Sequence, residues 1–293
     1  MRAFIGKISE SHIGALLALS YLLFSAIFWA YPFIWLIILS FSDWRFFDAP
    51  IFSGLHNVVV VLRDPEFWGG LWNVVRFFSI YFPIAFVGSL GFAFGLEHVG
   101  RGKAFIALCF LLANISSGVA FSLVFAKLFS STGPINNMVL SWFGFRIPWM
   151  SNPNLAMLAI ALVVAWKFIG YYGLILYSGL QTIPKELYDA ALLDNTPPLM
   201  RLVRITLPLI NAQLIMVLVF TILVSFAIFT EPYLITGGGP LGRTNMPLMI
   251  IYETAFRRLQ PSHAAMMSVI IAAVSYVLIR ITRKLLEKDV KLA

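Results

Sequence analysis

The stretch LAMLAIALVVAWKFIGYYGLILYSGL, residues 155–180, is a long apolar run whose one charged side chain is Lys167. A helix that crosses a bilayer needs about 20 predominantly apolar residues, so this run is long enough to span a membrane. The whole chain has the same character, because 60% of its 293 residues are hydrophobic and 12% are charged. A soluble domain has roughly 45–50% apolar and 25% charged residues. The composition therefore excludes a soluble enzyme, a secreted domain and a disordered protein, and it predicts an integral membrane protein.

Five further apolar runs accompany this one, so we predict an all-α, polytopic membrane protein with six transmembrane helices. The expected spans lie at residues 13–41, 71–96, 104–129, 155–180, 209–235 and 264–281. The first run is too long for the apolar part of a signal peptide, and no small-residue cleavage site follows it. We therefore expect a retained span and a single transmembrane domain over residues 1–293.

Lysine and arginine are unevenly distributed between the two sides of the expected spans. Six spans place both termini on one side, which holds twelve of these residues against six on the other. Since positively charged loops stay in the cytoplasm, we predict that both termini are cytoplasmic. The twelve are Arg2, Lys7, Arg101, Lys103, Lys185, Arg201, Arg204, Arg280, Arg283, Lys284, Lys288 and Lys291, and the six are Arg45, Arg63, Arg146, Arg243, Arg257 and Arg258.

Residues that bind metals or form catalytic groups are scarce. The single cysteine, Cys109, excludes an internal disulfide and a cysteine-based metal cluster. The four histidines lack the spacing of metal ligands, so we expect no metal site. The expected spans contain no Ser/His arrangement or paired aspartates for an intramembrane enzyme. The net charge of +8 belongs to the loops of a membrane protein and does not indicate a nucleic-acid partner.

Charged residues inside a bilayer are costly and usually functional. None of the 13 acidic residues falls inside an expected span, and Glu97 and Glu231 lie at span ends. The absence of a buried carboxylate argues against a carrier driven by protons or sodium. Lys167, near the middle of its span, has two interpretations. It is either a structural group paired with helix carbonyls or reaching along an aqueous cavity, or a lysine facing a translocation path for anionic or hydroxyl-rich solutes.

Small polar residues occur in two other spans. Thr221, Ser225 and Ile228 share one helix face. Hydroxyl groups in membrane helices usually bond neighbouring helices, and lining a path is the alternative. In the third span Gly118 follows two serines, which indicates either a close-packing point or a polar notch.

The segment at residues 182–208 has the signals of two short helices. Pro184 suits the first position of a helix, and Asn195 tolerates the left-handed backbone that ends one. Thr196 is then expected to cap a second helix with Pro197 at its first position. A helix resting on the membrane surface and a helix docked in the groove of a partner are both open interpretations. The small alanines of the first helix favour docking.

An acidic residue followed by two alanines, a turn residue and Ile-x-Leu-Pro resembles the coupling-helix motif of bacterial ABC importer permeases. The motif is carried by Asp189, Ala190, Ala191, Asn195, Ile205, Leu207 and Pro208. The run Leu234-Ile235-Thr236-Gly237-Gly238-Gly239-Pro240 resembles the Leu-Thr-x-Gly-Gly-Pro signature of the maltose and glycerol-phosphate type of these permeases. Arg101-Gly102-Lys103-Ala104 opens the third span as in the same group. The chain has Asp189 where the family has Glu, and Asn195 where the family has Gly.

This resemblance implies the fold of a type I ABC importer permease in the bacterial inner membrane. It implies a non-catalytic subunit that pairs with a second homologous permease, two ATP-binding subunits and a periplasmic solute-binding protein to import a carbohydrate. ATP and Mg would then be bound by the partner subunits, and no cofactor by this chain, which lacks the phosphate-binding motif GxxxxGK[ST]. The residues expected to couple to the ATPase are Asp189, Ala190, Ala191, Leu192, Asp194 and Asn195.

The resemblance also implies a solute path at mid-membrane. The residues expected to line it are Gly118, Val164, Lys167, Phe168, Tyr171, Thr221, Val224, Ser225 and Ile228. Phe168 and Tyr171 could stack on sugar rings, and Phe168 is bulky where the maltose pattern is small. Lys167 invites an acidic solute, and an alginate oligosaccharide is one candidate. The alternative function is a carrier or channel for polar solutes that acts alone.

Overall fold

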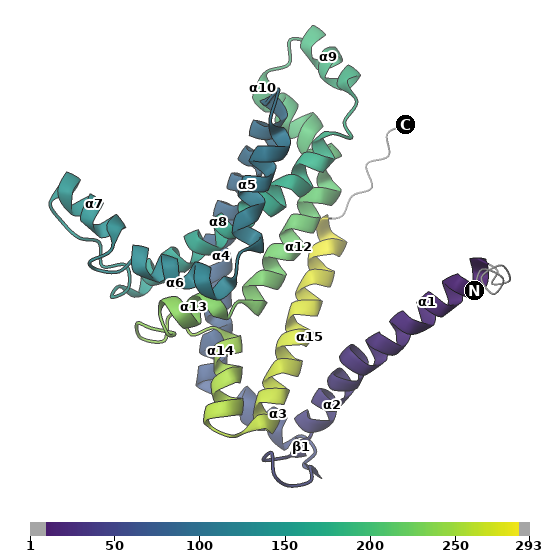
Figure 1. Ribbon diagram of the computed structural model, residues 1–293, viewed down its shortest axis with the longest axis vertical. Helices are drawn as coiled ribbons and strands as arrows, with labels where there is room; N and C mark the ends of the chain where they lie inside the picture. The colour runs from purple at the N-terminus through teal and green to yellow at the C-terminus, as the bar shows by residue number, and fades with distance from the viewer. Residues whose placement is uncertain (1–9, 287–293) are drawn as a thin grey trace, which may run out of the picture. The chain divides into compact units, whose positions relative to one another are not determined.

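The computed structural model describes residues 10–286, with side chains from residue 14, and these residues are almost entirely helical (Figure 1). They divide into two compact units, one made of the residues up to 64 with 251–270 and the other of 65–250 with those from 271 on. Four of the basic residues used to predict orientation lie outside the described residues. They are Arg2, Lys7, Lys288 and Lys291.

The first unit begins with a long apolar helix. Its elements are α1 (Glu10–Ser25), the π-helical turn η2 (Ala26–Ala30), α2 (Tyr31–Ser40), β1 (Ser42–Asp43), β2 (Ile51–Phe52), α3 (His56–Leu62) and the π-helical turn η4 (Glu253–Arg257). The two short strands pair antiparallel, with Ser42 opposite Phe52. The buried Asn57 amide donates hydrogen bonds to the carbonyl oxygens of Ser40 and Ser42 at 2.9 and 2.8 Å. These bonds fix the end of α2 to α3.

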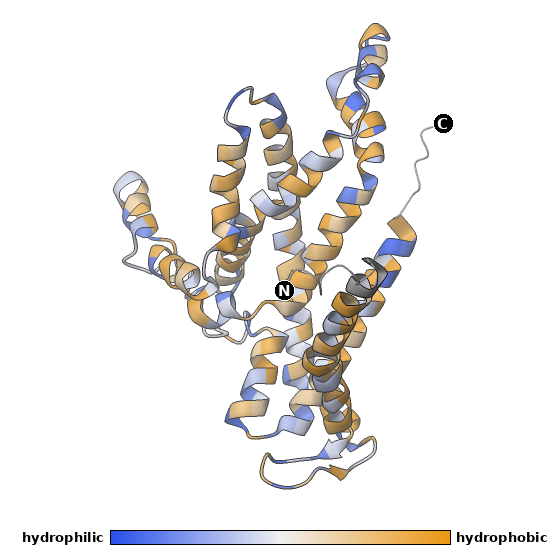
Figure 2. Cartoon of the chain, turned by 45° about the vertical axis from the view of Figure 1, so that its right-hand side comes forward, coloured by the Kyte–Doolittle hydropathy of each residue, from blue (hydrophilic) through white to orange (hydrophobic). Residues whose placement is uncertain are grey.

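The second unit is a bundle built around one long helix, α8. Its elements are α4 (Pro65–His98), α5 (Lys103–Ile115), α6 (Gly118–Leu128), α7 (Pro134–Phe143), α8 (Pro153–Leu180), α9 (Lys185–Leu193), α10 (Pro198–Arg201), the π-helical turn η3 (Leu202–Thr206), α11 (Leu207–Leu209), α12 (Asn211–Ala227) and α13 (Thr230–Ile235). Two more helices contribute residues to both units. Residues 247–250 of α14 (Pro247–Tyr252) and 271–286 of α15 (Pro261–Leu286) belong to the second unit, and their other residues belong to the first. Apolar residues follow the long helices of the bundle, and hydrophilic residues gather near several helix ends (Figure 2).

Small residues let α8 approach its neighbours closely. A methyl group on Gly170 would lie 2.6 Å from the Cβ atom of Phe110 in α5. Gly173 leaves the same kind of space for the ring of Phe92 in α4. Between α4 and α8 the fully buried hydroxyl groups of Tyr81 and Tyr172 share a hydrogen bond of 3.1 Å. Such close helix packing through small residues is the usual basis of helix association in lipid.

Four of the six predicted spans are continuous helices long and apolar enough to cross a membrane. They are Gly14–Ser40, Pro65–His98, Pro153–Leu180 and Pro261–Leu286. The other two predicted spans, 104–129 and 209–235, are wrong as straight helices. Helix α5 meets α6 at 92° inside the predicted span 104–129. The segment Pro198–Leu209 meets α12 at 76° at the start of the predicted span 209–235, and a separate break inside that span lies between the end of α12 at Ala227 and the start of α13 at Thr230. With each bent pair taken as one span, the described residues contain six spans by length and composition.

Both broken spans contain residues with extended backbone. Ser116 and Ser117, between α5 and α6, have ψ angles of 148° and 122°. Ile228, after the last residue of α12, has a ψ angle of 127°, and α13 begins only at Thr230. Serine weakens helices because its hydroxyl competes for the backbone. Ile228 has no such chemistry, so tertiary packing determines the second break.

We predict that Gly170→Ala destabilises the protein by about 1–3 kcal/mol, because overpacking a tight contact forces its neighbours apart. The matched control is Gly91→Ala in α4, where an added methyl group meets nothing within 4 Å. Thermal unfolding in detergent should show a lower midpoint for Gly170→Ala and an unchanged or higher one for the control. Equal midpoints would contradict the close contact between α5 and α8.

Candidate functional site

The two helix breaks meet in the second unit. Helix α6, which follows the first break, packs against α13, which follows the second, and α13 also contacts α8. Non-helical backbone at membrane depth is tolerated only where protein or a water-filled cavity satisfies it. The meeting point of α6, α8 and α13 is therefore the first place to look for function.

An ion pair occupies this meeting point. The Lys167 ammonium in α8 donates a hydrogen bond to Glu231 Oε1 in α13 at 2.8 Å. The two side chains are 15% and 8% exposed, so both charges are largely removed from solvent. The sequence placed Glu231 at a span end and found no carboxylate within a span. That expectation is wrong, because the break after α12 brings the carboxylate beside the middle of α8.

Aromatic rings and a glycine surround the lysine. The Lys167 ammonium lies 5.9 Å from the ring centres of both Phe121 and Phe168, within the range of attraction between a cation and a ring face. A methyl group on Gly118 would lie 3.6 Å from the Lys167 nitrogen and 3.7 Å from the Thr230 methyl group. The structure thus brings three of the predicted path residues, Gly118, Lys167 and Phe168, into one cluster.

A partly exposed aromatic surface adjoins this cluster. Tyr171 in α8 and Phe220 in α12 have ring centres 6.0 Å apart. Phe168, Tyr171 and Val224 are each half-buried, so they remain accessible in the isolated chain. Ring faces with a phenol hydroxyl are suited to a ligand that has apolar and hydroxyl surfaces. Phe220 was missed from the sequence because it is one of many phenylalanines in apolar runs.

The other four predicted path residues are buried in the chain. Thr221 and Ser225 donate hydrogen bonds to the carbonyl oxygens of Leu218 and Thr221 at 2.8 and 2.7 Å. Val164 and Ile228 are 1% and 5% exposed. Their role in a path stays a prediction.

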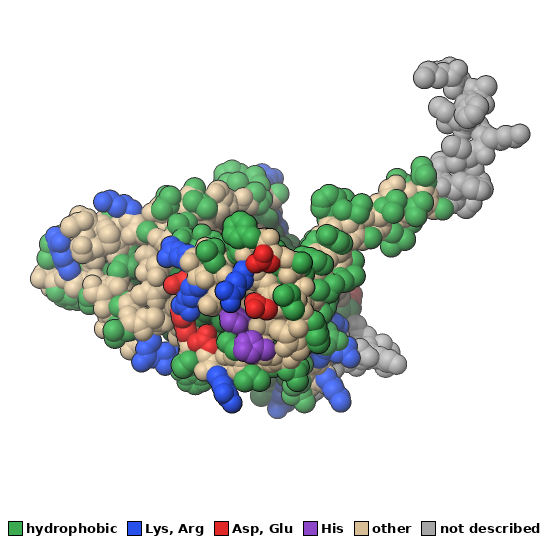
Figure 3. All heavy atoms as spheres, turned by 90° about the horizontal axis from the view of Figure 1, so that it is seen from below, with side chains coloured by type: hydrophobic (Ala, Val, Ile, Leu, Met, Phe, Trp, Pro, Cys, Tyr) green, Lys and Arg blue, Asp and Glu red, His purple; other side chains and the backbone are tan. Residues whose placement is uncertain are grey.

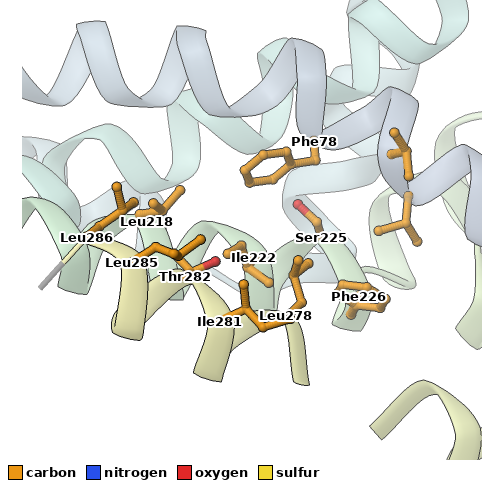
Figure 4. Close-up of a pocket in the computed structure, with 12 residues that line it drawn as sticks. Phe78, Leu218, Ile222, Ser225, Phe226, Leu278, Ile281, Thr282, Leu285 and Leu286 are labelled. Atoms are coloured by element: carbon orange, nitrogen blue, oxygen red, sulfur yellow. The ribbon is translucent and has the colours of Figure 1, made fainter. Parts of the chain in front are cut away.

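Ser225 lies at an apolar groove of about 470 Å³ between α4, α12 and α15 (Figure 4). Its neighbours there include Phe78, Ile222 and Leu278. The groove presents almost no polar atoms, and the Ser225 hydroxyl is already bound to backbone. It is an apolar packing surface within the bundle and has no chemistry for a sugar.

The predicted coupling segment folds into a helix with a defined end. Asn195 has a left-handed φ of +50°. The Asn195 N–H donates to Leu192 O at 3.0 Å, and the Thr196 N–H donates to Ala191 O at 2.9 Å. These two bonds form a Schellman motif, in which a left-handed residue closes the helix. Asn195 therefore performs the turn that the sequence predicted for it.

The second short helix differs from the prediction. Helix α9 begins at Lys185, directly after Pro184, and α10 begins at Pro198 rather than Pro197. Thr196 does not cap α10, because the later start places Pro197 at the N-cap position, with no side-chain capping hydrogen bond. The Tyr188 hydroxyl lies 2.9 Å from the Thr206 hydroxyl and joins α9 to η3.

Helix α9 presents small and apolar side chains to solvent. Asp189 and Ala190 are exposed, and Ala191 is buried. Leu192 and Leu193 are 54% and 85% exposed. Figure 1 shows α9 at the upper end of the second unit, away from α6 and α13. Exposed apolar surface of this kind marks sites of contact with proteins or membranes.

The first unit carries a polar pocket that the sequence did not single out. It measures about 410 Å³, and its lining includes Asp43, Arg45, Arg258 and His263. The rings of His56 and His263 have centres 6.5 Å apart. Figure 3 shows histidines beside acidic and basic side chains on this face. Among the described residues, no group of three His, Cys, Asp or Glu side chains could hold a metal ion.

Comparison with known proteins identifies the type of chain. Residues 88–292 match the family described as binding-protein-dependent transport system inner membrane component. The sulfoquinovosyl glycerol transport system permease protein of Agrobacterium fabrum is 33% identical over 226 residues, which cover 76% of this chain and 73% of that protein. The lactose transport system permease protein of Rhizobium radiobacter is 30% identical, covering 86% of this chain and 87% of that protein.

The fold is also found in a solved structure. A chain of a bacterial ABC transporter involved in the import of the acidic polysaccharide alginate superposes with a TM-score of 0.81 at 18% sequence identity. The match covers 99% of this chain and 100% of that chain. It confirms the predicted fold.

We predict that Asn195→Ala weakens the end of α9, because the left-handed backbone costs an alanine about 1–2 kcal/mol. The amide protons of Asn195 and Thr196 should then exchange with solvent about five- to thirtyfold faster. Asn195→Gly is the matched control and should retain the protection of the original chain. Hydrogen exchange followed by mass spectrometry measures both, and unchanged exchange in Asn195→Ala would contradict the Schellman end.

Proposed function

The chain belongs to the family of binding-protein-dependent transport system inner membrane components, and from this premise we propose that it forms half of the translocation path of an ATP-driven carbohydrate importer. It is a permease subunit by family membership. The two relatives described above are named for transport of lactose and of sulfoquinovosyl glycerol. A carbohydrate delivered by a periplasmic binding protein is the solute class that agrees with these relatives.

The observation that carries the proposal is the exposed helix α9. Four residues, 181–184, separate it from the end of α8, so force applied to α9 reaches the centre of the bundle directly. Ala190 leaves room for close approach, and Leu192 and Leu193 offer apolar contact. We assign α9, with Asp189 through Asn195, as the part that docks on an ATP-binding subunit. ATP hydrolysis and Mg binding are then tasks of that partner.

A complete path requires a second permease. The accessible surface formed by Phe168, Tyr171 and Val224 lies on one chain only, and a partner of similar fold would close the opposite side. With α9 on the ATPase side, both termini are cytoplasmic, in agreement with the greater number of lysines and arginines assigned to that side.

The ion pair affects the choice of solute. Lys167 suggested an acidic solute when its charge was considered alone. Glu231 compensates that charge at 2.8 Å, so the cluster presents no net charge to a ligand. The physical reason for choosing an alginate oligosaccharide is thereby removed, and we assign a carbohydrate without assigning its charge.

A carrier or channel that acts alone is the alternative function. The buried Glu231 supplies the kind of carboxylate that the sequence analysis found missing, so that argument against a carrier no longer holds. Purification of the tagged chain from its native membrane distinguishes the two functions. An ATP-binding subunit and a second permease should copurify with it. A chain recovered alone, or only with copies of itself, would contradict the importer.

We predict that Ala190→Arg prevents copurification of the ATP-binding subunit, because a long charged side chain would enter the docking surface. Gln181→Arg, which adds the same exposed charge four residues before α9, is the control and should retain the subunit. The ratio of ATP-binding subunit to permease in the purified complex measures the effect. An unchanged ratio in Ala190→Arg would exclude α9 as the docking helix.

We predict that Tyr171→Leu lowers carbohydrate uptake about two- to tenfold, because one stacked aromatic contact contributes about 0.5–1.5 kcal/mol. Phe105→Leu in α5, whose side chain is 70% exposed, is the control and should leave uptake unchanged. Uptake is measured with the complete complex in proteoliposomes. Equal uptake by the two variants would show that Tyr171 does not contact the solute.

A further inference from the structure

A buried ion pair, Lys167–Glu231, joins two helices of the second unit. One is α8, which leads to α9, and the other is α13, which leads to the turn that contains Gly237, Gly238 and Gly239, here called the glycine turn. Lys167 belongs to α8, whose end lies four residues before α9. Glu231 belongs to α13, which is followed directly by the turn at residues 236–245. The pair therefore links the helix that precedes α9 with the helix that precedes this turn.

Helix α8 is held as a rigid element by its packing. Gly170 contacts Phe110 of α5, and a methyl group on Gly88 of α4 would lie 2.7 Å from the Ile169 side chain. Close-packed interiors transmit displacement rather than absorb it. Movement of α9 is accordingly delivered to Lys167.

The turn after α13 is equally well fixed. The hydroxyl groups of Thr236 and Thr244 lie 2.7 Å apart. The Asn73 amide donates to the carbonyl oxygens of Gly242 and Asn245 at 2.8 and 3.0 Å. These bonds hold the turn in one shape, and the two from Asn73 also attach it to α4.

Helix α13 is separated from α12 by the extended Ile228. The break leaves α13 able to move without α12, and its contacts with α6 and α8 decide its position. A buried ion pair adds little net stability compared with apolar side chains of the same size. It does impose one geometry, because each charge is costly to leave alone in a site of low dielectric constant.

We infer that the Lys167–Glu231 ion pair is the joint that couples α8 to α13 and thereby transmits movement of α9 to the glycine turn. Lys167 and Glu231 are positioning residues in this scheme. The pair stays closed while the helices move, so that α13 follows α8. This inference rests on the proposed function, because it requires α9 to be driven by an ATP-binding subunit.

The test uses the complete importer, with both permeases, the ATP-binding subunits and the binding protein, in proteoliposomes. Lys167→Met/Glu231→Gln replaces both charges with side chains of similar size, and Glu231→Gln alone is the smaller change. The measurement is ATP hydrolysis with and without solute-loaded binding protein. A structural role alone would change assembly but not the ratio of these two rates in assembled complexes.

We expect the double variant to assemble, while the stimulation of ATP hydrolysis by the binding protein falls about fivefold or more. Glu231→Gln should change the ratio in the same direction. Stimulation equal to that of the original complex in an assembled variant would overturn the inference. Failure of both variants to assemble would overturn it as well, because the pair would then be an element of folding.

Tyr81→Phe/Tyr172→Phe is the matched control. It removes a buried hydrogen bond between α4 and α8 in the same bundle, yet leaves α8 joined to α13. Its stimulation ratio should be unchanged, and a loss equal to that of the double charge variant would contradict a specific joint. The original complex separates the two proposals. If the binding protein does not stimulate ATP hydrolysis by the original complex, the proposed function fails. If it stimulates the original complex and the double charge variant equally, only the proposed role of the ion pair fails.

Discussion

Backbone hydrogen bonding inside the bilayer constrains everything else in this protein. A helix satisfies its own N–H and C=O groups, and a break exposes several of them where no water can compensate. The chain nevertheless interrupts its helices inside two of the predicted spans, at Ser116–Ser117 within 104–129 and at Ile228–Phe229 within 209–235. Both breaks lie where α6, α8 and α13 meet. Ile228 is buried there, whereas Ser116 and Ser117 are exposed on this chain. The Lys167–Glu231 ion pair occupies the same place.

The central position of α8 follows from this arrangement. It packs against α4 and α5 through glycines and contacts α13 through the ion pair. It also leads within four residues to the exposed helix α9. Family membership makes the chain a permease, and α8 is the helix that connects the exposed α9 with the broken spans. The aromatic surface of Phe168 and Tyr171 lies on that same helix.

Local chemistry explains which features were predictable from the sequence. The six spans follow from long apolar runs, and the end of α9 follows from the tolerance of Asn195 for a left-handed backbone. The serines before Gly118 indicated a close-packing point or a polar notch in the third span, and neither they nor hydropathy revealed the bend of 92°. The break at Ile228 had no signal, because an isoleucine in an apolar run is typical of a continuous helix.

The ion pair could not be predicted from the sequence, for a different reason. Lys167 and Glu231 are 64 positions apart, and only the second break brings the carboxylate to the middle of α8. Without it the lysine appeared unpaired and suggested an acidic solute. The expectation that Thr196 would cap α10 was wrong because α10 begins at Pro198, one residue later than expected, which places Pro197 at the N-cap position.

Uptake by the reconstituted complex tests the central claim most directly. The chain would be combined with its second permease, the ATP-binding subunits and the binding protein, and radiolabelled carbohydrate would be followed into proteoliposomes. An importer of the kind described accumulates carbohydrate only when ATP and the binding protein are both present. Accumulation by this chain alone, or without ATP, would contradict that function.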